Sequence, residues 1–495
     1  MSTFTPSLSK TKYLAGLQCH KLLWYHYNAK DKIPPPDQHT QAIFDQGHLV
    51  GQFAKRLYPG GIEIEASYND FPGMLKQTRE ALLQRKPIFE AALQAQHAFA
   101  RADILNPVGK NAWDIIEVKS STEVKDVNLE DIAFQKYTYE NAGLKVGKCF
   151  VMYINNKYVR KGDIEPEKLF IQEDVTKAID SISKNVQQNI ETMLKTIQRK
   201  THPDILIGAY CSDPYDCALI GLCWDYLPED NVLTLYRLRE ERKFGLIYEG
   251  ITDIRKLPSD FALSETQQIQ VDAVRSREPH IDKEEIRSFL GKVGYPIYFL
   301  DFETFMTAIP MFDLVRPYQQ VPFQYSLHVL RSAKSSPEHY WFLSDGTADP
   351  RPVILEQLEG RLGDKGSIVS YNARFEKGML KDCSDVYGKY AKWYKGIEGR
   401  IVDLLEPFSS FAYYHPGQHG TASIKAVLPA LTGKSYEDLE IAEGGTASDE
   451  YLRVTFGTNI DPQDKQKVYG QLDEYCKLDT QAMIDVLGEL RRISR

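Results

Sequence analysis

Residues 297–304 read IYFLDFET, an apolar run that carries two acids, Asp301 and Glu303. In a β-strand, successive side chains point to opposite faces, so residues two apart share a face. The two carboxylates therefore leave one face of an apolar strand, where they repel each other unless a cation neutralises them. Oxygen ligands of this kind suit Mg²⁺ or Mn²⁺. The stretch predicts a buried strand with a divalent-metal site; the alternative is an exposed strand end with solvated acids.

Two later motifs add polar residues to this pair. The segment SIVSYNARFEKGML runs from an apolar strand into a helix and is expected to place Asn372 and Glu376, four residues apart, on one helical face. Tyr475 and Asp479, in YCKLD, have the same spacing on a predicted helix near the C-terminus. Each pair taken alone is typical of a solvated helix face. Together with the strand, they supply an acid pair, a third acid, and a fourth acid preceded by a tyrosine.

This ordered set resembles the DEDD superfamily of 3′→5′ exonucleases, in the subclass with a tyrosine. The resemblance covers about 295–495 and implies an RNase H-like mixed sheet with flanking helices. It also implies two-metal hydrolysis of phosphodiester bonds, with Tyr475 orienting the attacking water. Glu376 stands where the second motif usually ends in Asp. The implied ligands of the two cations are Asp301, Glu303, Glu376 and Asp479.

Two neighbouring features accompany these motifs. Asp403, in RIVDLL, is a fallback acid for the position of Glu376. The loop HPGQHGTASIK contains His415, His419 and Lys425, which either bind phosphate or serve the structure of the loop.

A second polar set lies in the N-terminal half. Residues 97–119 predict a hairpin, in which HAFARADIL and AWDIIEVK are joined by the turn NPVGKN. Asp103 lies on the first strand, and Glu117 and Lys119 share a face of the second, where Asp103 can meet them. The backbone carbonyl of Val118 is a further oxygen ligand, and the lysine can stabilise charge that develops on a phosphate. By itself, E-V-K describes any half-buried strand.

The pattern D-x13-E-x-K, followed by Gln135 and Tyr139 on a helix predicted at about 128–141, resembles the PD-(D/E)xK nucleases of the RecB and AddB type. The resemblance implies a restriction-endonuclease-like core with a second metal-dependent site. These nucleases usually place a metal-binding histidine in G-x-L-V-H, but this chain has Gly51 at that position, and His48 lies one turn earlier. Either the site lacks that ligand or His48 substitutes. The implied site residues are Asp103, Glu117, Val118, Lys119, Gln135 and Tyr139.

The cysteines are distributed unevenly. Cys211, Cys217 and Cys223 fall within thirteen residues after the nuclease-like core, and Cys19 precedes it. Four thiolates can ligate a 4Fe-4S cluster or a structural Zn²⁺, whereas the alternative is that small apolar cysteines fill a core. One early and three late cysteines resemble the arrangement of CRISPR-associated RecB-like exonucleases, which implies a 4Fe-4S cluster. The remaining cysteines are expected in the core: Cys149, Cys383 and Cys476.

Length and composition limit the class of protein. The 495 residues indicate two to four domains, and a net charge of −8 argues against a wholly electrostatic nucleic-acid coat. It does not exclude a nuclease, because metal-binding carboxylates count as negative. No apolar run reaches the roughly 18 residues of a membrane span, and MSTFTPSLSKTKYL lacks a signal-peptide layout, so a cytoplasmic location is expected.

The sequence therefore predicts an α/β protein with three parts: a RecB-like PD-(D/E)xK domain with an Fe–S-stapled helical part at 1–225, a helical connector at 226–290, and a DEDD-type domain at 291–495. The arrangement resembles a bacterial family that pairs the two domain types. It implies a metal-dependent DNA exonuclease acting on single-stranded ends, in DNA repair or anti-phage defence. Two alternatives are that only the C-terminal domain cuts while the other clamps DNA, and that the chain is a non-catalytic Fe–S DNA-binding module of a larger complex.

Overall fold

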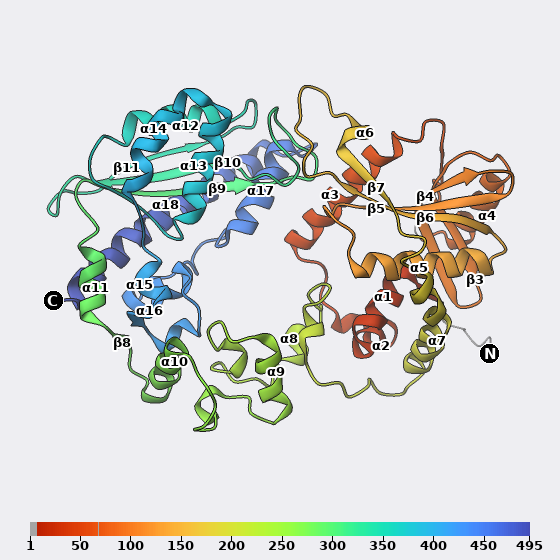
Figure 1. Ribbon diagram of the computed structural model, residues 1–495, viewed down its shortest axis with the longest axis horizontal. Coiled ribbons are helices and arrows are strands. Elements are labelled where there is room, and N and C mark those ends of the chain that lie inside the picture. Colours follow the sequence, from red (N-terminus) through yellow and green to blue (C-terminus); the bar gives the residue numbers. More distant parts are fainter. Residues whose placement is uncertain (1–6, 68) are drawn as a thin grey trace. The chain divides into compact units, whose positions relative to one another are not determined.

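The computed structural model describes residues 7–67 and 69–495, and the chain divides into two compact units (Figure 1). Unit 1 comprises Met1–Tyr226 and Thr307–Tyr318, and unit 2 comprises Leu227–Met306 and Gln319–Arg495. Both units mix helices with a sheet, so the α/β class is as predicted. After its first residue, the predicted connector belongs to unit 2.

Unit 1 is built on a seven-stranded sheet in the order β2-β3-β4-β5-β6-β7, with β1 paired to β4. The predicted hairpin is the antiparallel pair β4 and β5, and β5 pairs in parallel with β6 after the crossover helix α5. The strands are β1 (Leu8–Ser9), β2 (Ile62–Glu63), β3 (Ile88–Ala95), β4 (Ala98–Val108), β5 (Ala112–Lys119), β6 (Lys145–Ile154) and β7 (Phe170–Asp174).

Helices cover both faces of this sheet because apolar side chains alternate along its strands. Ile115 packs into a core with α1, α5 and α7, whereas Ile116, the next residue of β5, packs into the opposite core with α3. The helices of unit 1 are α1 (Lys10–Gln18), α2 (His20–Asn28), α3 (Gln38–Lys55), α4 (Phe71–Leu82), α5 (Asp126–Asn141), α6 (Pro166–Leu169), α7 (Asp180–Ile197) and α8 (Ile220–Cys223).

The segment Thr307–Tyr318, which the sequence had placed in the C-terminal domain, completes the core of unit 1. Ala308 and Ile309 are buried in the core on the α3 face of the sheet. Arg160 fixes the segment from the β6–β7 connection, since its Nη1 donates to the carbonyl of Pro310 at 2.9 Å. This stretch therefore packs in unit 1, although the residues before and after it in the sequence belong to unit 2.

Unit 2 contains a five-stranded sheet in the order β11-β10-β9-β12-β13. The strand quoted above, β9, is central, which explains its apolar character: it pairs antiparallel with β10 and parallel with β12. A separate antiparallel pair joins β8 to β14. The strands are β8 (His280–Ile281), β9 (Ile297–Phe305), β10 (Val321–Leu330), β11 (Glu338–Leu343), β12 (Ser367–Ser370), β13 (Ile401–Asp403) and β14 (Tyr413–Tyr414).

The two faces of β9 have different partners. Tyr298, Leu300 and Phe302 form a core with α12, α13 and α14. The helix α18 packs against β9 on the face that carries Asp301 and Glu303, since Cys476 of α18 lies beside both acids. The helices of unit 2 are α9 (Glu240–Tyr248), α10 (Glu265–Ser276), α11 (Lys283–Leu290), α12 (Arg351–Arg361), α13 (Arg374–Val386), α14 (Ala391–Ile397), α15 (Glu406–Ser409), α16 (Ile424–Thr432), α17 (Gly444–Phe456) and α18 (Pro462–Ile493).

Across the described residues, no helix combines the length and the apolar character needed to cross a bilayer. The N-terminal stretch used above to predict a location includes residues 1–6, which lie outside the described residues.

Candidate functional site

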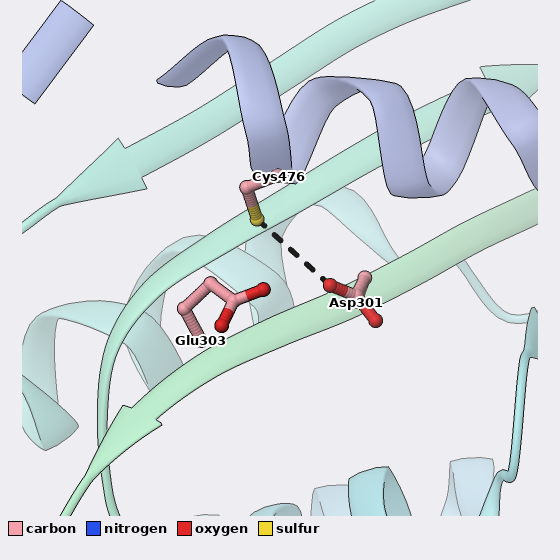
Figure 2. Close-up of side chains that lie close together, drawn as sticks. All are labelled: Asp301, Glu303 and Cys476. Atoms are coloured by element: carbon pink, nitrogen blue, oxygen red, sulfur yellow. Dashed lines mark hydrogen bonds between the residues drawn. The ribbon is translucent and has the colours of Figure 1, made fainter. Parts of the chain in front are cut away.

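The first candidate site lies in unit 2, between β9 and α18. Asp301 and Glu303 leave β9 on the same side, and Cys476 reaches them from α18 (Figure 2). One ligand atom of each of these residues lies within 4.8 Å of the others. The Sγ atom of Cys476 is 4.0 Å from Oδ2 of Asp301. Cys476 is fully buried, as predicted for a core residue, but its thiol also faces the acids, which the sequence reasoning missed.

Asp479 and Tyr475 lie one turn apart on α18, as their spacing predicted. The hydroxyl of Tyr436 donates to Oδ1 of Asp479 at 2.8 Å. Burial raises the pKa of Asp479 to about 6, although Tyr436, Lys425 and Tyr475 each act to lower it. The Nζ atom of Lys425 lies 5.1 Å from the ring centre of Tyr475. These contacts bring two tyrosines and a cation next to the fourth acid.

Burial and like charge act together on the acid pair. Burial and the neighbouring Asp479 and Glu303 raise the pKa of Asp301 well above its usual range. Burial and Asp479 do the same to Glu303, and Lys425 opposes both shifts. Carboxyls this close together cannot all ionise without a counter-cation. The donor set therefore suits a divalent cation.

Glu376, on α13, joins this group. Its side chain is buried, and its Oε2 atom has no hydrogen-bond partner in the described part of the chain. Burial raises the pKa of Glu376 to about 8, and the negative charge of Asp403 adds to the shift. The carboxylate also contributes to the raised pKa of Asp301. An unpaired oxygen buried beside other acids is available as a metal ligand, which fits the predicted role.

The surroundings of Glu376 differ from the prediction at Asn372. The prediction that the two residues share a helical face is wrong, because α13 begins at Arg374 and Asn372 lies before it with φ of 66°. The backbone N–H of Asn372 instead donates to Oδ1 of Asp403 at 2.9 Å, and that of Leu405 donates to the same oxygen at 3.0 Å. Asp403 therefore ties the ends of two parallel strands.

The histidines and the lysine of the loop HPGQHGTASIK have different surroundings. Nδ1 of His415 accepts from the backbone N–H of Gly417 at 3.0 Å and caps the short turn that follows it. His419 lies 3.2 Å from Oδ1 of Asp230. The two histidines thus serve the local structure, whereas Lys425 from the same predicted set lies beside the acids.

The second candidate site lies in unit 1, where most of the predicted residues meet. Oδ2 of Asp103 on β4 accepts from the backbone N–H of Val118 at 2.7 Å. Nζ of Lys119 lies 2.7 Å from Oε1 of Glu117, and Nε2 of Gln135 donates to Oε2 of Glu117 at 2.7 Å. Glu117 is 1% exposed. The strand β5 and the helix α5 therefore bring their polar residues to one buried point.

Two further residues at this point were missed by the sequence reasoning. Asp131 accepts from Lys119 at 2.8 Å, and Lys10 of α1 lies 2.6 Å from Oε1 of Glu117. Asp131 precedes Gln135 by one turn of α5, so the i, i+4 spacing was a usable signal. Lys10 lies 107 residues from Glu117 along the chain, and no local pattern connects them.

The ion network sets the charges at this site. Burial, Asp103 and Asp131 raise the pKa of Glu117 to about 7, and Lys10 and Lys119 oppose that shift. Burial also acts to raise the pKa of Asp131, but the two lysines outweigh it and hold that pKa well below its usual range. Asp131 therefore stays ionised, whereas the raised pKa of Glu117 lies close to neutral pH.

Tyr139 has a different role from the one predicted. Its hydroxyl donates to the backbone carbonyl of Ala91 and accepts from the N–H of Ala102 at 3.0 Å. These groups belong to the adjacent strands β3 and β4. The hydroxyl thus supports the sheet beneath the site.

At Gly51, where the resembling nucleases have a metal-binding histidine, the structure leaves free space. His48 is exposed on α3, and a Cβ atom built at Gly51 would meet no heavy atom within 4 Å. Gly51 therefore supplies no side-chain ligand to the Asp103–Glu117 site.

The four cysteines of the predicted set line one pocket in unit 1. Cys19 lies between α1 and α2, where burial raises the pKa of its thiol and the N–H groups of Leu22 and Lys21 act in the opposite direction. Burial raises the pKa of Cys217 to about 11. Thiols gathered around one cavity, with backbone donors beside them, fit a four-thiolate metal group. The cysteines are Cys19, Cys211, Cys217 and Cys223.

Comparison with known proteins gives two matches. Residues 298–423 match a family described as a domain of unknown function (DUF2779). The chain is also similar to a protein of Mycoplasma pneumoniae (strain ATCC 29342 / M129 / Subtype 1) described as "Uncharacterized protein MG366 homolog", with 25% identity over 279 residues. This match covers 52% of the chain and 42% of the relative, so the chain aligns with less than half of that protein's length.

Proposed function

We propose that the chain is a metal-dependent nuclease that hydrolyses phosphodiester bonds at single-stranded DNA ends, with the cutting site in unit 2. The observation that carries the proposal is the acid pair of β9 beside Cys476 of α18, where burial and the charges of Asp479 and Glu376 raise the pKa of both acids. The order and types of these residues resemble the DEDD exonucleases. A mixed sheet with helices on both faces is consistent with the RNase H-like fold of that superfamily.

Each residue has a role in the proposed reaction. When bound, two divalent cations would supply an activated water and stabilise the leaving 3′-oxygen. The Tyr475 hydroxyl would orient the attacking water. Lys425, beside Tyr475, offers a positive charge to the phosphate. The residues that would hold the cations are Asp301, Glu303, Glu376 and Asp479.

For unit 1, two functions are weighed. The meeting of Asp103, Glu117, Lys119 and Gln135 resembles a PD-(D/E)xK site and favours a second cleavage centre. The contact of Lys10 with Glu117 favours the alternative, in which unit 1 grips DNA without cutting it. Either function suits an enzyme of DNA repair or anti-phage defence.

The cysteine pocket is proposed to hold a 4Fe-4S cluster, with Zn²⁺ as the alternative. The support is that one early and three late cysteines meet at a single pocket, as in the RecB-like exonucleases that this region resembles. Anaerobically purified protein should be brown, with a broad absorbance at about 400 nm and iron bound. A colourless sample that contains zinc would contradict the cluster.

The cleavage proposal is tested with 5′- and 3′-labelled single-stranded DNA and RNA in Mg²⁺ or Mn²⁺. Asp301→Asn should lower the rate of metal-dependent cleavage by about 10³-fold, because it removes a central ligand. The matched control is Asp364→Asn, a change of an exposed acid in the same unit. Full activity in Asp301→Asn would refute the assignment of the cutting site, and DNA binding without any cleavage by the wild type would favour a non-catalytic module. Metal-dependent cleavage that remains in Asp301→Asn and is abolished by adding Glu117→Ala would indicate that both units cut.

A further inference from the structure

Lys10 is held by the backbone at a fixed place beside the acids of unit 1. It is the first residue of α1 and follows β1 directly, where Ser9 pairs in parallel with Phe99 of β4. From this anchored position, its Nζ atom lies 2.6 Å from Oε1 of Glu117 and 3.8 Å from Oδ2 of Asp131. The ammonium group therefore lies between two buried carboxylates, one of which, Glu117, belongs to the predicted set of cation ligands.

The carboxylates at this point already have donors. Oε1 of Glu117 contacts both Lys10 and Lys119, at 2.6 and 2.7 Å, and its Oε2 accepts from Gln135 at 2.7 Å. Asp131 accepts from Lys119 at 2.8 Å and from Gln135 at 2.9 Å. The side chains of Glu117 and Asp131 are each 2% exposed, so little solvent competes with these contacts. A buried carboxylate with this many donors gains little from a further cation.

Two other observations point the same way. Gly51 stands where the resembling nucleases have a metal-binding histidine, and it presents no side chain. One oxygen of Asp103 is bound to the backbone N–H of Val118. A divalent cation at Glu117 would also lie beside two ammonium groups, and like charges at this separation in a buried site repel strongly. The predicted metal thus does not fit the residues present.

We infer that the unit 1 site is built around the ammonium group of Lys10 in place of a divalent cation. Unit 1 therefore holds no catalytic divalent cation in this arrangement. The nuclease-like acids of unit 1 form an ion network with Lys10 and Lys119 instead. The inference concerns cation binding and does not depend on whether unit 2 cuts DNA.

The test is the binding of Mn²⁺ to the full chain, with unit 2 silenced by Asp301→Asn. Mn²⁺ binding is followed by electron paramagnetic resonance and by calorimetry. In this background, Glu117→Gln should not reduce the bound Mn²⁺, because Lys10 already fills the site. Adding Lys10→Met to the background should create one new Mn²⁺ site, and Glu117→Gln should then weaken it at least about tenfold. Lys12→Met, on the same helix, is the matched control and should create no site.

Thermal unfolding gives an independent measurement. Lys10→Met leaves acids unpaired and should lower the midpoint of unfolding, and Mn²⁺ should restore it, whereas the Lys12→Met midpoint should not depend on Mn²⁺. The inference is overturned if the protein with Lys10 intact loses a Mn²⁺ site on Glu117→Gln. It is also overturned if Lys10→Met folds and gains no site. Should Lys10→Met fail to fold, the Glu117→Gln comparison in the Lys10 protein still decides the question.

Discussion

Cys476 places a thiol among the carboxylates of unit 2, and this single residue should alter which metals bind there. Thiolates select softer metals such as Zn²⁺, whereas carboxylates alone suit Mg²⁺ and Mn²⁺. Because its sulfur lies within 4.8 Å of ligand atoms of Asp301 and Glu303, Cys476→Ser should weaken Zn²⁺ binding about tenfold and leave the Mg²⁺ dependence of cleavage nearly unchanged. Cys383→Ser, which changes another buried thiol of unit 2, is the control. Equal Zn²⁺ affinity in all three proteins would contradict a role for the thiol.

The raised pKa values of the buried acids predict how the stability of the protein depends on pH. The pKa is raised to about 8 for Glu376, about 7 for Glu117 and about 6 for Asp479, mainly by burial. A group whose folded pKa is raised binds more protons in the folded state, so the free energy of unfolding should fall as pH rises from about 4 to 8. Thermal unfolding in EDTA at several pH values measures this fall. Mg²⁺ should reduce it by neutralising the acids of unit 2.

A single substitution isolates one of these groups. Glu376→Gln removes a buried charge, so the metal-free protein should gain about 1 kcal/mol or more of unfolding free energy at pH 8. The same change should weaken Mg²⁺ binding, because it removes a ligand oxygen. A variant that is less stable than wild type in EDTA at this pH would show that the carboxylate is not strained there.

Two tyrosines of the helix α5 allow a structural role of Tyr139 to be distinguished from a catalytic one. Tyr139→Phe removes a hydroxyl that joins Ala91 and Ala102, so it should destabilise the protein by about 1–3 kcal/mol. Tyr137→Phe, at a half-buried position of the same helix, should cost about 0.5 kcal/mol or less. Urea unfolding of both variants measures the difference. A small effect of Tyr139→Phe on stability, with a large effect on DNA cleavage, would restore the catalytic interpretation.

The elements also show what the sequence can predict. The strand β9 and the shared face of Asp301 and Glu303 follow from alternation, and the pairing of Tyr475 with Asp479 follows from helical spacing, because both are local patterns. Periodicity reports which residues of one element share a face but not what covers that face. The pattern therefore predicts Cys476 as a core residue only, and it places Asn372 inside the helix that in fact begins at Arg374.

For the whole chain, the α/β class and the meeting of the polar residues of unit 1 were within reach of sequence reasoning. The position of Lys10 was not, because its contact with Glu117 depends on how β1 joins β4. The resemblance to metal nucleases predicted a cation at that point, whereas the contacts provide an ammonium group. The family pattern thus predicts which acids meet in unit 1, but it does not predict that Lys10 lies beside them.

The cysteine pocket makes a prediction about unit 1 as a whole. It joins Cys19 near the start of the segment Met1–Tyr226 to Cys217 near the end of that segment, so a metal group there would close a long loop of chain. Cys217→Ser should lower the bound iron to well below half of the wild-type content and reduce the midpoint of unfolding. Cys149→Ser, at a fully buried position in the core of unit 1, should reduce stability but keep the iron. Unchanged iron in Cys217→Ser would remove that residue from the proposed ligands.

The segment Thr307–Tyr318 bears on how the protein can be divided. A fragment that ends at Tyr226 lacks Ala308 and Ile309, so an apolar part of its core would be left open to water, where it favours aggregation. A fragment that begins at Leu227 would carry the same apolar residues without their partners. Dividing the chain once, between Tyr226 and Leu227, therefore leaves both fragments with exposed apolar residues. Separate expression calls for grafting Thr307–Tyr318 onto the first piece through a linker and bridging the gap between Met306 and Gln319 in the second.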